Sequence, residues 1–70
     1  MATVMTNLKV SQDKVQIAMA REKMNPYDLC SASGISYAAY RQIMKKGSCK
    51  IATLGKLAAA LKVDVTEIID

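Results

Sequence analysis

The sequence predicts a compact, all-α domain of five short helices. Apolar residues recur at the three- and four-residue spacing of amphipathic helices, and strict two-residue alternation is rare. Side chains that cap helix starts precede these stretches, and glycines or short polar segments separate them. The chain has 70 residues, enough for a single small core. We therefore expect one domain over residues 8–70, preceded by a flexible N-terminal tail over residues 1–7.

The first helix is predicted to begin near Ser11 and to end at about Met24. Val15, Ala18 and Met19 fall on one side of this helix at helical spacing. This side is expected to face the core.

The second helix has the best-marked start in the chain. Asn25 can accept a hydrogen bond as the N-cap, Pro26 suits the first helical position, and Asp28 places a negative charge at the positive helix end. The helix should stop near Ser33, because Gly34 can adopt the left-handed conformation that ends helices.

The second half of the chain contains the remaining three predicted helices. Ser36 is a natural cap for a helix over residues 37–46, and residues 47–50 are interpreted as a loop. A fourth helix is expected over residues 51–61. Asp64, with Glu67 three residues later, has the pattern of a capping box that starts a last short helix.

The basic residues are unevenly distributed along the chain. From residue 29 to residue 63 there is no acidic residue, while the formal net charge of the whole chain is +4. A stretch of one sign attracts polyanions, although such a stretch can also be an ordinary solvated surface. The bases of this stretch are Arg41, Lys45, Lys46, Lys50, Lys56 and Lys62.

The composition argues against an enzyme and against a metal site. The chain has no histidine, the commonest general base, and its two cysteines, Cys30 and Cys49, lack metal-site spacing. We expect Cys30 to be a buried free thiol. No stretch is apolar enough to span a membrane, and no signal peptide is visible, so a cytoplasmic protein without cofactor, metal or small-molecule substrate is expected.

The segment over residues 25–46 has the pattern of a helix-turn-helix. Two helices are joined by a turn that contains Gly34, and in such a motif the second helix enters the DNA major groove. Generic corners between two helices share this pattern.

Residues 8–70 resemble the lambda-repressor-like Cro/CI-type (XRE) helix-turn-helix family, particularly its short stand-alone members. The matching stretches are LKVSQDKV, NPYDLCSASGIS, YRQI and TLGKLAAALKVDVTEIID. The resemblance implies a five-helix domain that binds double-stranded DNA, usually as a homodimer on a pseudo-palindromic operator. Three departures from the family pattern stand out: Pro26 in place of a phosphate-bridging glutamine, apolar residues at Met19 and Met44 where an ion pair is common, and Gly47 one residue late.

The resemblance implies that the helix over residues 37–46 is the recognition helix. The residues that would read bases are Tyr37, Ala38, Arg41 and Gln42. The Gln42 side chain can form hydrogen bonds with adenine, and the Ala38 methyl can contact a thymine methyl group. Tyr37 could bond a phosphate instead of a base, or it could pack over the turn. Arg41 can reach phosphate or guanine. The residues that would contact phosphate are Asn25, Tyr27, Ser36, Lys45, Lys46 and Lys50.

These expectations lead to a sequence-specific, double-stranded DNA-binding transcriptional regulator that acts as a repressor. The alternatives are a protein-interaction module with the same fold, such as an antitoxin or anti-repressor partner, and an architectural DNA binder. We expect two chains per DNA site. Ile68 and Ile69 are candidates for the dimer contact, and packing of these two residues on the first helix is the alternative.

Overall fold

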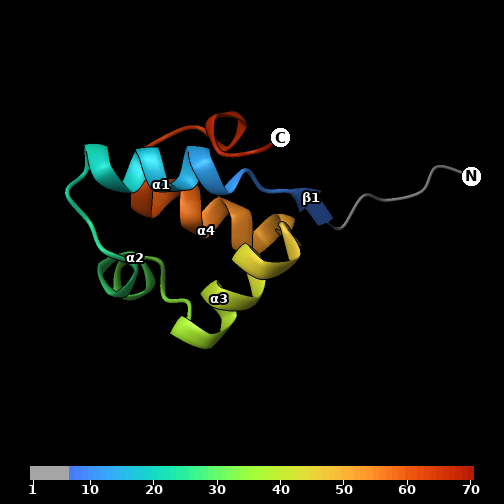
Figure 1. Ribbon diagram of the computed structural model, residues 1–70, viewed down its shortest axis with the longest axis horizontal. Coiled ribbons are helices and arrows are strands. Elements are labelled where there is room, and N and C mark those ends of the chain that lie inside the picture. Colours follow the sequence, from blue (N-terminus) through green and yellow to red (C-terminus); the bar gives the residue numbers. More distant parts are fainter. Residues whose placement is uncertain (1–6) are drawn as a thin grey trace, which may run out of the picture.

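The computed structural model describes residues 7–70 (Figure 1). This part of the chain contains four α-helices, one 3₁₀ helix and one two-stranded antiparallel sheet. The elements in chain order are β1 (Asn7–Lys9), α1 (Gln12–Arg21), α2 (Pro26–Ser33), α3 (Tyr37–Lys46), β2 (Ser48–Lys50), α4 (Ile51–Leu61) and the 3₁₀ helix η1 (Val65–Glu67). The fold is mostly helical, as the sequence indicates, but the all-α, five-helix prediction is wrong in detail.

The two strands of the sheet form from segments that the sequence did not predict as strands. Residues 48–50, interpreted as a loop, form β2, and Asn7, assigned to the tail, begins β1; residues 1–6 lie outside the described residues. Leu8 pairs with Cys49 at the centre of the sheet, and the N–H of Val10 donates to the carbonyl of Gly47 at 2.8 Å. Strands of three residues are too short to show alternation. The central pair, Leu8 and Cys49, is 41 positions apart in the sequence, so no local pattern indicates the pairing.

The helix starts follow the predicted caps. The side chains of Ser11, Asn25 and Ser36 each accept a backbone hydrogen bond from the first turn of α1, α2 and α3. Helix α1 ends at Arg21, earlier than expected, because Lys23 takes a left-handed conformation with φ 57°. The N–H of residue 24 then donates back to the carbonyl of residue 19 at 2.9 Å, a bond typical of helix ends.

The core is a single hydrophobic cluster to which all four α-helices contribute buried side chains. Helix α2 packs against α3 and α4, and η1 packs on α4. In Figure 1, η1 lies at the top of the molecule and α2 and α3 at the bottom, with α1 and α4 between them. Burial of these side chains supplies the main driving force for folding. The largest fully buried side chains are those of Val15, Leu29, Leu54, Leu57, Leu61 and Ile68.

The C-terminal segment closes the core. The capping box of Asp64 and Glu67 is present, but it begins a 3₁₀ helix of three residues and not an α-helix. Ile68 is fully buried, and Ile69 is half-buried and forms a β-bridge with Val10. Ile68 therefore belongs to the protein's own core and has no surface to offer to a second chain.

Candidate functional site

The turn between α2 and α3 fixes the angle of the two helices. Gly34 has φ 74°, and its N–H and that of Ile35 both donate to the carbonyl of Cys30, at 2.9 and 3.1 Å. The left-handed conformation is one that glycine adopts without strain. Ser36 then caps α3 by accepting from the N–H of Ala39 at 3.1 Å. The geometry is that of the expected helix-turn-helix.

Helix α3 buries one face and exposes the other. Tyr40 and Ile43 are each 7% exposed and hold the helix against the core. The opposite face carries no acidic residue. Its exposed side chains are Tyr37, Ala38, Arg41, Gln42, Lys45 and Lys46.

A first surface hollow, the α1–α3 hollow, has a volume of about 790 Å³. It runs along one flank of the exposed face of α3 and is bordered on the other side by the start of α1. All four predicted base-reading residues line it. The lining residues are Gln12, Gln16, Tyr37, Ala38, Tyr40, Arg41, Gln42, Met44 and Lys45.

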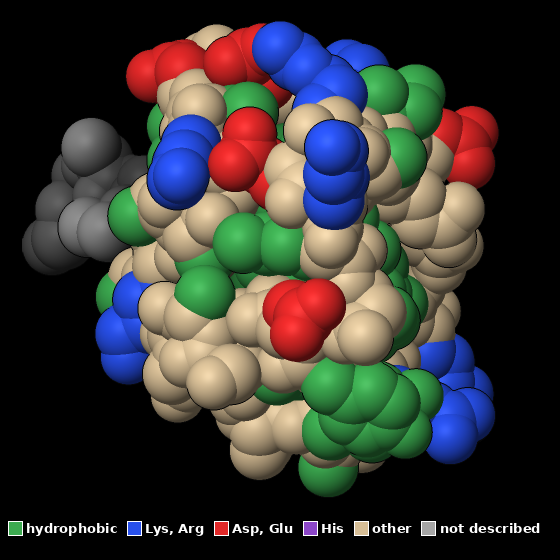
Figure 2. Space-filling model, turned by 90° about the vertical axis from the view of Figure 1, so that its left-hand side faces the viewer, with side chains coloured by type: hydrophobic (Ala, Val, Ile, Leu, Met, Phe, Trp, Pro, Cys, Tyr) green, Lys and Arg blue, Asp and Glu red, His purple; other side chains and the backbone are tan. Residues whose placement is uncertain are grey.

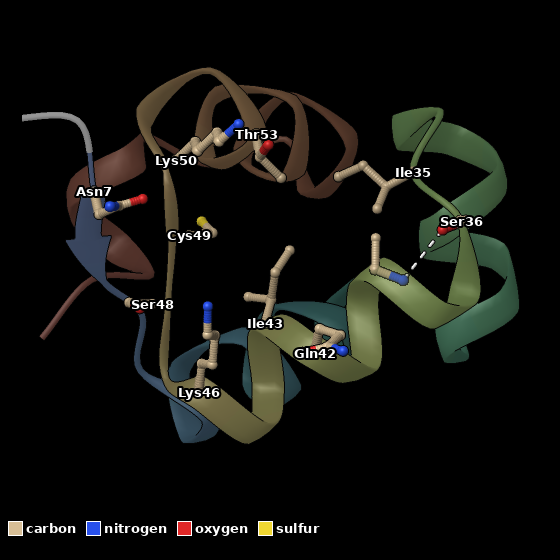
Figure 3. A pocket seen from close by; sticks show the side chains of 11 residues that line it. Asn7, Ile35, Ser36, Gln42, Ile43, Lys46, Ser48, Cys49, Lys50 and Thr53 are labelled. Carbon is tan, nitrogen blue, oxygen red and sulfur yellow. Dashed lines mark hydrogen bonds between the residues drawn. The ribbon is translucent and has the colours of Figure 1, made fainter.

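A second hollow, the α3–α4 hollow, has a volume of about 570 Å³ (Figure 3). Helix α3 forms one wall and the start of α4 the other, with β2 between them, and Lys46 and Lys50 approach it from opposite walls. Gln42 borders both hollows, so it sits on the ridge that separates them. The lining residues are Asn7, Ile35, Ser36, Ala39, Gln42, Ile43, Lys46, Ser48, Cys49, Lys50 and Thr53.

Two predicted phosphate contacts, Asn25 and Tyr27, lie outside these hollows. The Oδ1 of Asn25 accepts from the N–H of Asp28 at 2.8 Å, and the N–H of Asn25 donates to Asp28 Oδ2 at 3.1 Å. Pro26 has no N–H. Within the described residues, the first turn of α2 therefore keeps the backbone N–H of Tyr27 as its free backbone donor, beside the carboxylate of Asp28.

The three tyrosines connect the start of α2 to α3. The rings of Tyr27 and Tyr37 stack at a centroid distance of 4.7 Å, and those of Tyr37 and Tyr40 lie 6.1 Å apart. Burial raises the pKa of the Tyr40 hydroxyl, with smaller contributions from Cys30 and Tyr37. Tyr27 thus lies beside the exposed face of α3 through its contact with Tyr37.

Both ion pairs of the described residues lie outside α3. Arg21 pairs with Glu67 at 3.8 Å, and Lys62 pairs with Glu22 at 3.6 Å. Figure 2 shows positive and negative side chains mixed at the upper end of the molecule. At the lower right, hydrophobic atoms are exposed with positive side chains to their right and an acidic side chain above them.

The basic side chains around α3 are not paired with acids. Within residues 7–70, no carboxylate oxygen lies within 4.0 Å of the basic groups of Arg41, Lys45, Lys46 or Lys50. Uncompensated cations of this kind produce a positive potential around α3.

The structure adds polar residues that were not singled out from the sequence. Gln12 and Gln16 lie one turn apart on α1 and face the α1–α3 hollow, and the Nε2 of Gln12 donates to the carbonyl of Met44. Ser48 and Thr53 line the other hollow beside Lys50. The i, i+4 spacing of the two glutamines was the signal that could have identified them as one polar face.

The two thiols are structural. Cys30 and Cys49 are free and buried, and burial raises the pKa of both thiols, so both are protonated near neutral pH. Over residues 7–70, no three potential metal-ligating side chains of His, Cys, Asp or Glu come together. No helix of that part of the chain is long and apolar enough to cross a membrane.

Comparison with known proteins gives one family. A family model described as the Cro/C1-type HTH DNA-binding domain matches residues 14–70. No curated protein and no solved structure matches the chain. The matched residues include α2, the turn, α3 and α4, and therefore the whole of the exposed α3 face.

Proposed function

The chain belongs to the Cro/C1-type helix-turn-helix DNA-binding domain family, and from this premise we propose that it is a sequence-specific transcriptional regulator that inserts α3 into the major groove of duplex DNA. The observation that carries the proposal is the exposed face of α3. It combines side chains able to read base edges with cations that no acid neutralises.

The dimensions of α3 suit this role. Ten helical residues extend for about 15 Å, and the major groove, at about 12 Å wide, admits a helix. Gln42 borders both hollows near the middle of the exposed face, where it would meet a base edge, with Ala38 one turn earlier. The amide of Gln42 can form paired hydrogen bonds with adenine, and Arg41 can reach guanine or a flanking phosphate.

The flanks of α3 would hold the DNA backbone. Lys45 lines one hollow, and Lys46 and Lys50 line the other, so cations would face the phosphates on both sides of the inserted helix. The hydroxyl of Ser36 accepts from Ala39 and still has its hydrogen to donate to a phosphate.

A further phosphate would bind at the start of α2. The amide Nδ2 of Asn25 and the backbone N–H of Tyr27 would donate to it, because the other groups of that turn are used in the cap. Contacts of this kind fix register without reading sequence.

We further propose that two chains bind each operator. One recognition helix covers a short half-site, and a two-fold pair places two such helices about 34 Å apart on one face of the DNA. Since Ile68 is buried, the contact between chains must use other residues. Mass measurement of the complex on a selected site should give two chains per duplex; one chain per duplex at saturation would contradict the dimer.

Binding to duplex DNA under changing salt tests the proposal as a whole. If Arg41, Lys45, Lys46 and Lys50 each neutralise one phosphate, the slope of log K against log salt should be about −3.6 per chain, at about −0.9 per contact. A folded protein that shows no duplex binding at low salt would refute the proposal. Circular dichroism of the same sample establishes that it is folded.

Repression by occupancy is the regulatory outcome we propose. A bound dimer covers DNA that polymerase must use, so transcription from a promoter that contains the selected site should fall when the protein is added. A rise in transcript in the same purified system would identify an activator.

A further inference from the structure

The aromatic side chains of the protein lie in one row that runs from the core to the exposed start of α3. The chain has three tyrosines and neither phenylalanine nor tryptophan. Tyr37, the first residue of α3, stacks on Tyr27 of α2 with ring planes 16° apart, and on Tyr40 with planes 26° apart. Exposure rises along the row, from 7% at Tyr40 through 37% at Tyr37 to 66% at Tyr27.

This arrangement restrains Tyr37 from two directions. Tyr40 is held by the core, and Tyr27 projects from a helix start that is fixed by the Asn25 cap and by Pro26. Offset stacking favours roughly parallel rings at these distances, so each neighbour limits the rotation of Tyr37 about its side-chain bonds. An exposed tyrosine in the first turn of a helix would otherwise sample several rotamers.

The surface that Tyr37 shares with Ala38 is apolar. Both residues are exposed at the start of α3, and no charged residue occupies the first turn. On the floor of the major groove, the apolar group that such a surface can contact is the C5 methyl of thymine. An aromatic ring contributes to discrimination only if it is held where that methyl lies, because ordering a mobile side chain on binding has an entropic cost.

We propose that Tyr27 is a positioning residue for base recognition: by stacking on Tyr37, it holds the Tyr37 ring against the methyl group of one thymine in each half-site. The inference rests on the proposed insertion of α3 into the major groove. It assigns to Tyr27 a role in specificity that differs from the phosphate contact expected from the sequence.

Replacement of thymine by uracil isolates this contact, because it removes one methyl group and leaves every hydrogen-bonding group of the base pair in place. Each thymine of the selected operator is replaced in turn, and the affinity of the full-length chain is measured by fluorescence anisotropy. Loss of one buried methyl is expected to weaken wild-type binding about fourfold at the position that Tyr37 contacts.

Two variants of Tyr27 separate stacking from its hydroxyl. Tyr27→Phe keeps the ring, so any loss of a phosphate contact should lower the affinity for thymine and uracil sites equally and preserve the fourfold ratio. Tyr27→Ala removes the stack, so the ratio at that position should fall toward one. Tyr37→Ala should abolish the ratio at the same position and identify which thymine is involved.

The outcomes distinguish this inference from the function on which it rests. If uracil weakens no position, or if Tyr27→Ala keeps the wild-type ratio everywhere, the positioning role is wrong although specific binding stands. If the wild type does not bind duplex DNA, the proposed function and the inference fail together.

Discussion

Gln42 and Lys46 are four residues apart on α3, yet their surroundings differ. Gln42 borders both hollows at the middle of the exposed face, whereas Lys46 is the last residue of α3 and borders only the α3–α4 hollow, opposite Lys50. Gln42→Ala should therefore relax the preference at one base pair. Lys46→Ala should weaken binding to all sequences.

The magnitudes follow from the two kinds of contact. A bidentate contact to a base is worth about 1–3 kcal/mol of discrimination, so Gln42→Ala should reduce the preference at its base pair by roughly 5- to 150-fold. Loss of one phosphate contact should make the salt slope shallower by about one unit in Lys46→Ala, with base preferences retained. The slope of Gln42→Ala should match that of the wild type, because it removes no charge.

The assay is anisotropy with the selected operator and its single-base variants at several salt concentrations. Lys56→Ala is the matched control, because it removes the same charge from an exposed residue of α4 that borders neither hollow. Its salt slope should stay near that of the wild type. If Gln42→Ala and Lys46→Ala produce the same uniform loss, Gln42 does not read a base.

Three further predictions concern the fold. Leu54 is 1% exposed, so Leu54→Ala should lower the free energy of unfolding by about 2–5 kcal/mol in urea denaturation; a loss below that of a surface substitution would contradict the core described. No atom lies within 4 Å of a Cβ added at Gly34 or Gly55, but of these two glycines only Gly34 has a positive φ. In thermal unfolding, Gly34→Ala should therefore destabilise the protein by about 1–2 kcal/mol, whereas Gly55→Ala, within α4, should stabilise it by up to about 1 kcal/mol. Equal effects of the two substitutions would contradict the left-handed turn at Gly34. Because both cysteine thiols are buried and burial raises their pKa, they should react slowly with a thiol reagent at pH 7 in the native protein and at the free-thiol rate in denaturant. Rapid reaction of the native protein would show that the thiols are exposed.

The helices could be predicted because their signals are local. The Asn25 cap, Pro26, Asp28 and Gly34 lie within ten residues and specify the start and the end of α2 almost independently of the rest of the chain. The spacing of buried residues in α4 is equally local. These elements agree with the structure because propensity, capping and burial favour the same conformation.

The sheet and the hollows depend on contacts between distant segments. Residues 48–50 form a strand because residues 7–9 pair with them, and no residue pattern in either segment indicates this pairing. The contribution of Gln12 and Gln16 to the α1–α3 hollow depends on how α1 crosses α3, as does the stack of Tyr27 on Tyr37. The bounds of α3 could be predicted from the sequence, whereas the hollows on its two flanks required the fold.

A backbone amide titration with the selected duplex, followed by nuclear magnetic resonance, tests most directly whether DNA lies on the α3 face. We expect the largest shift changes at the start of α2 and over residues 36–50, with little change around the ion pairs of Arg21 with Glu67 and Lys62 with Glu22. Largest changes at those ion pairs, or no saturable change at all, would contradict the proposal that this protein reads DNA with α3.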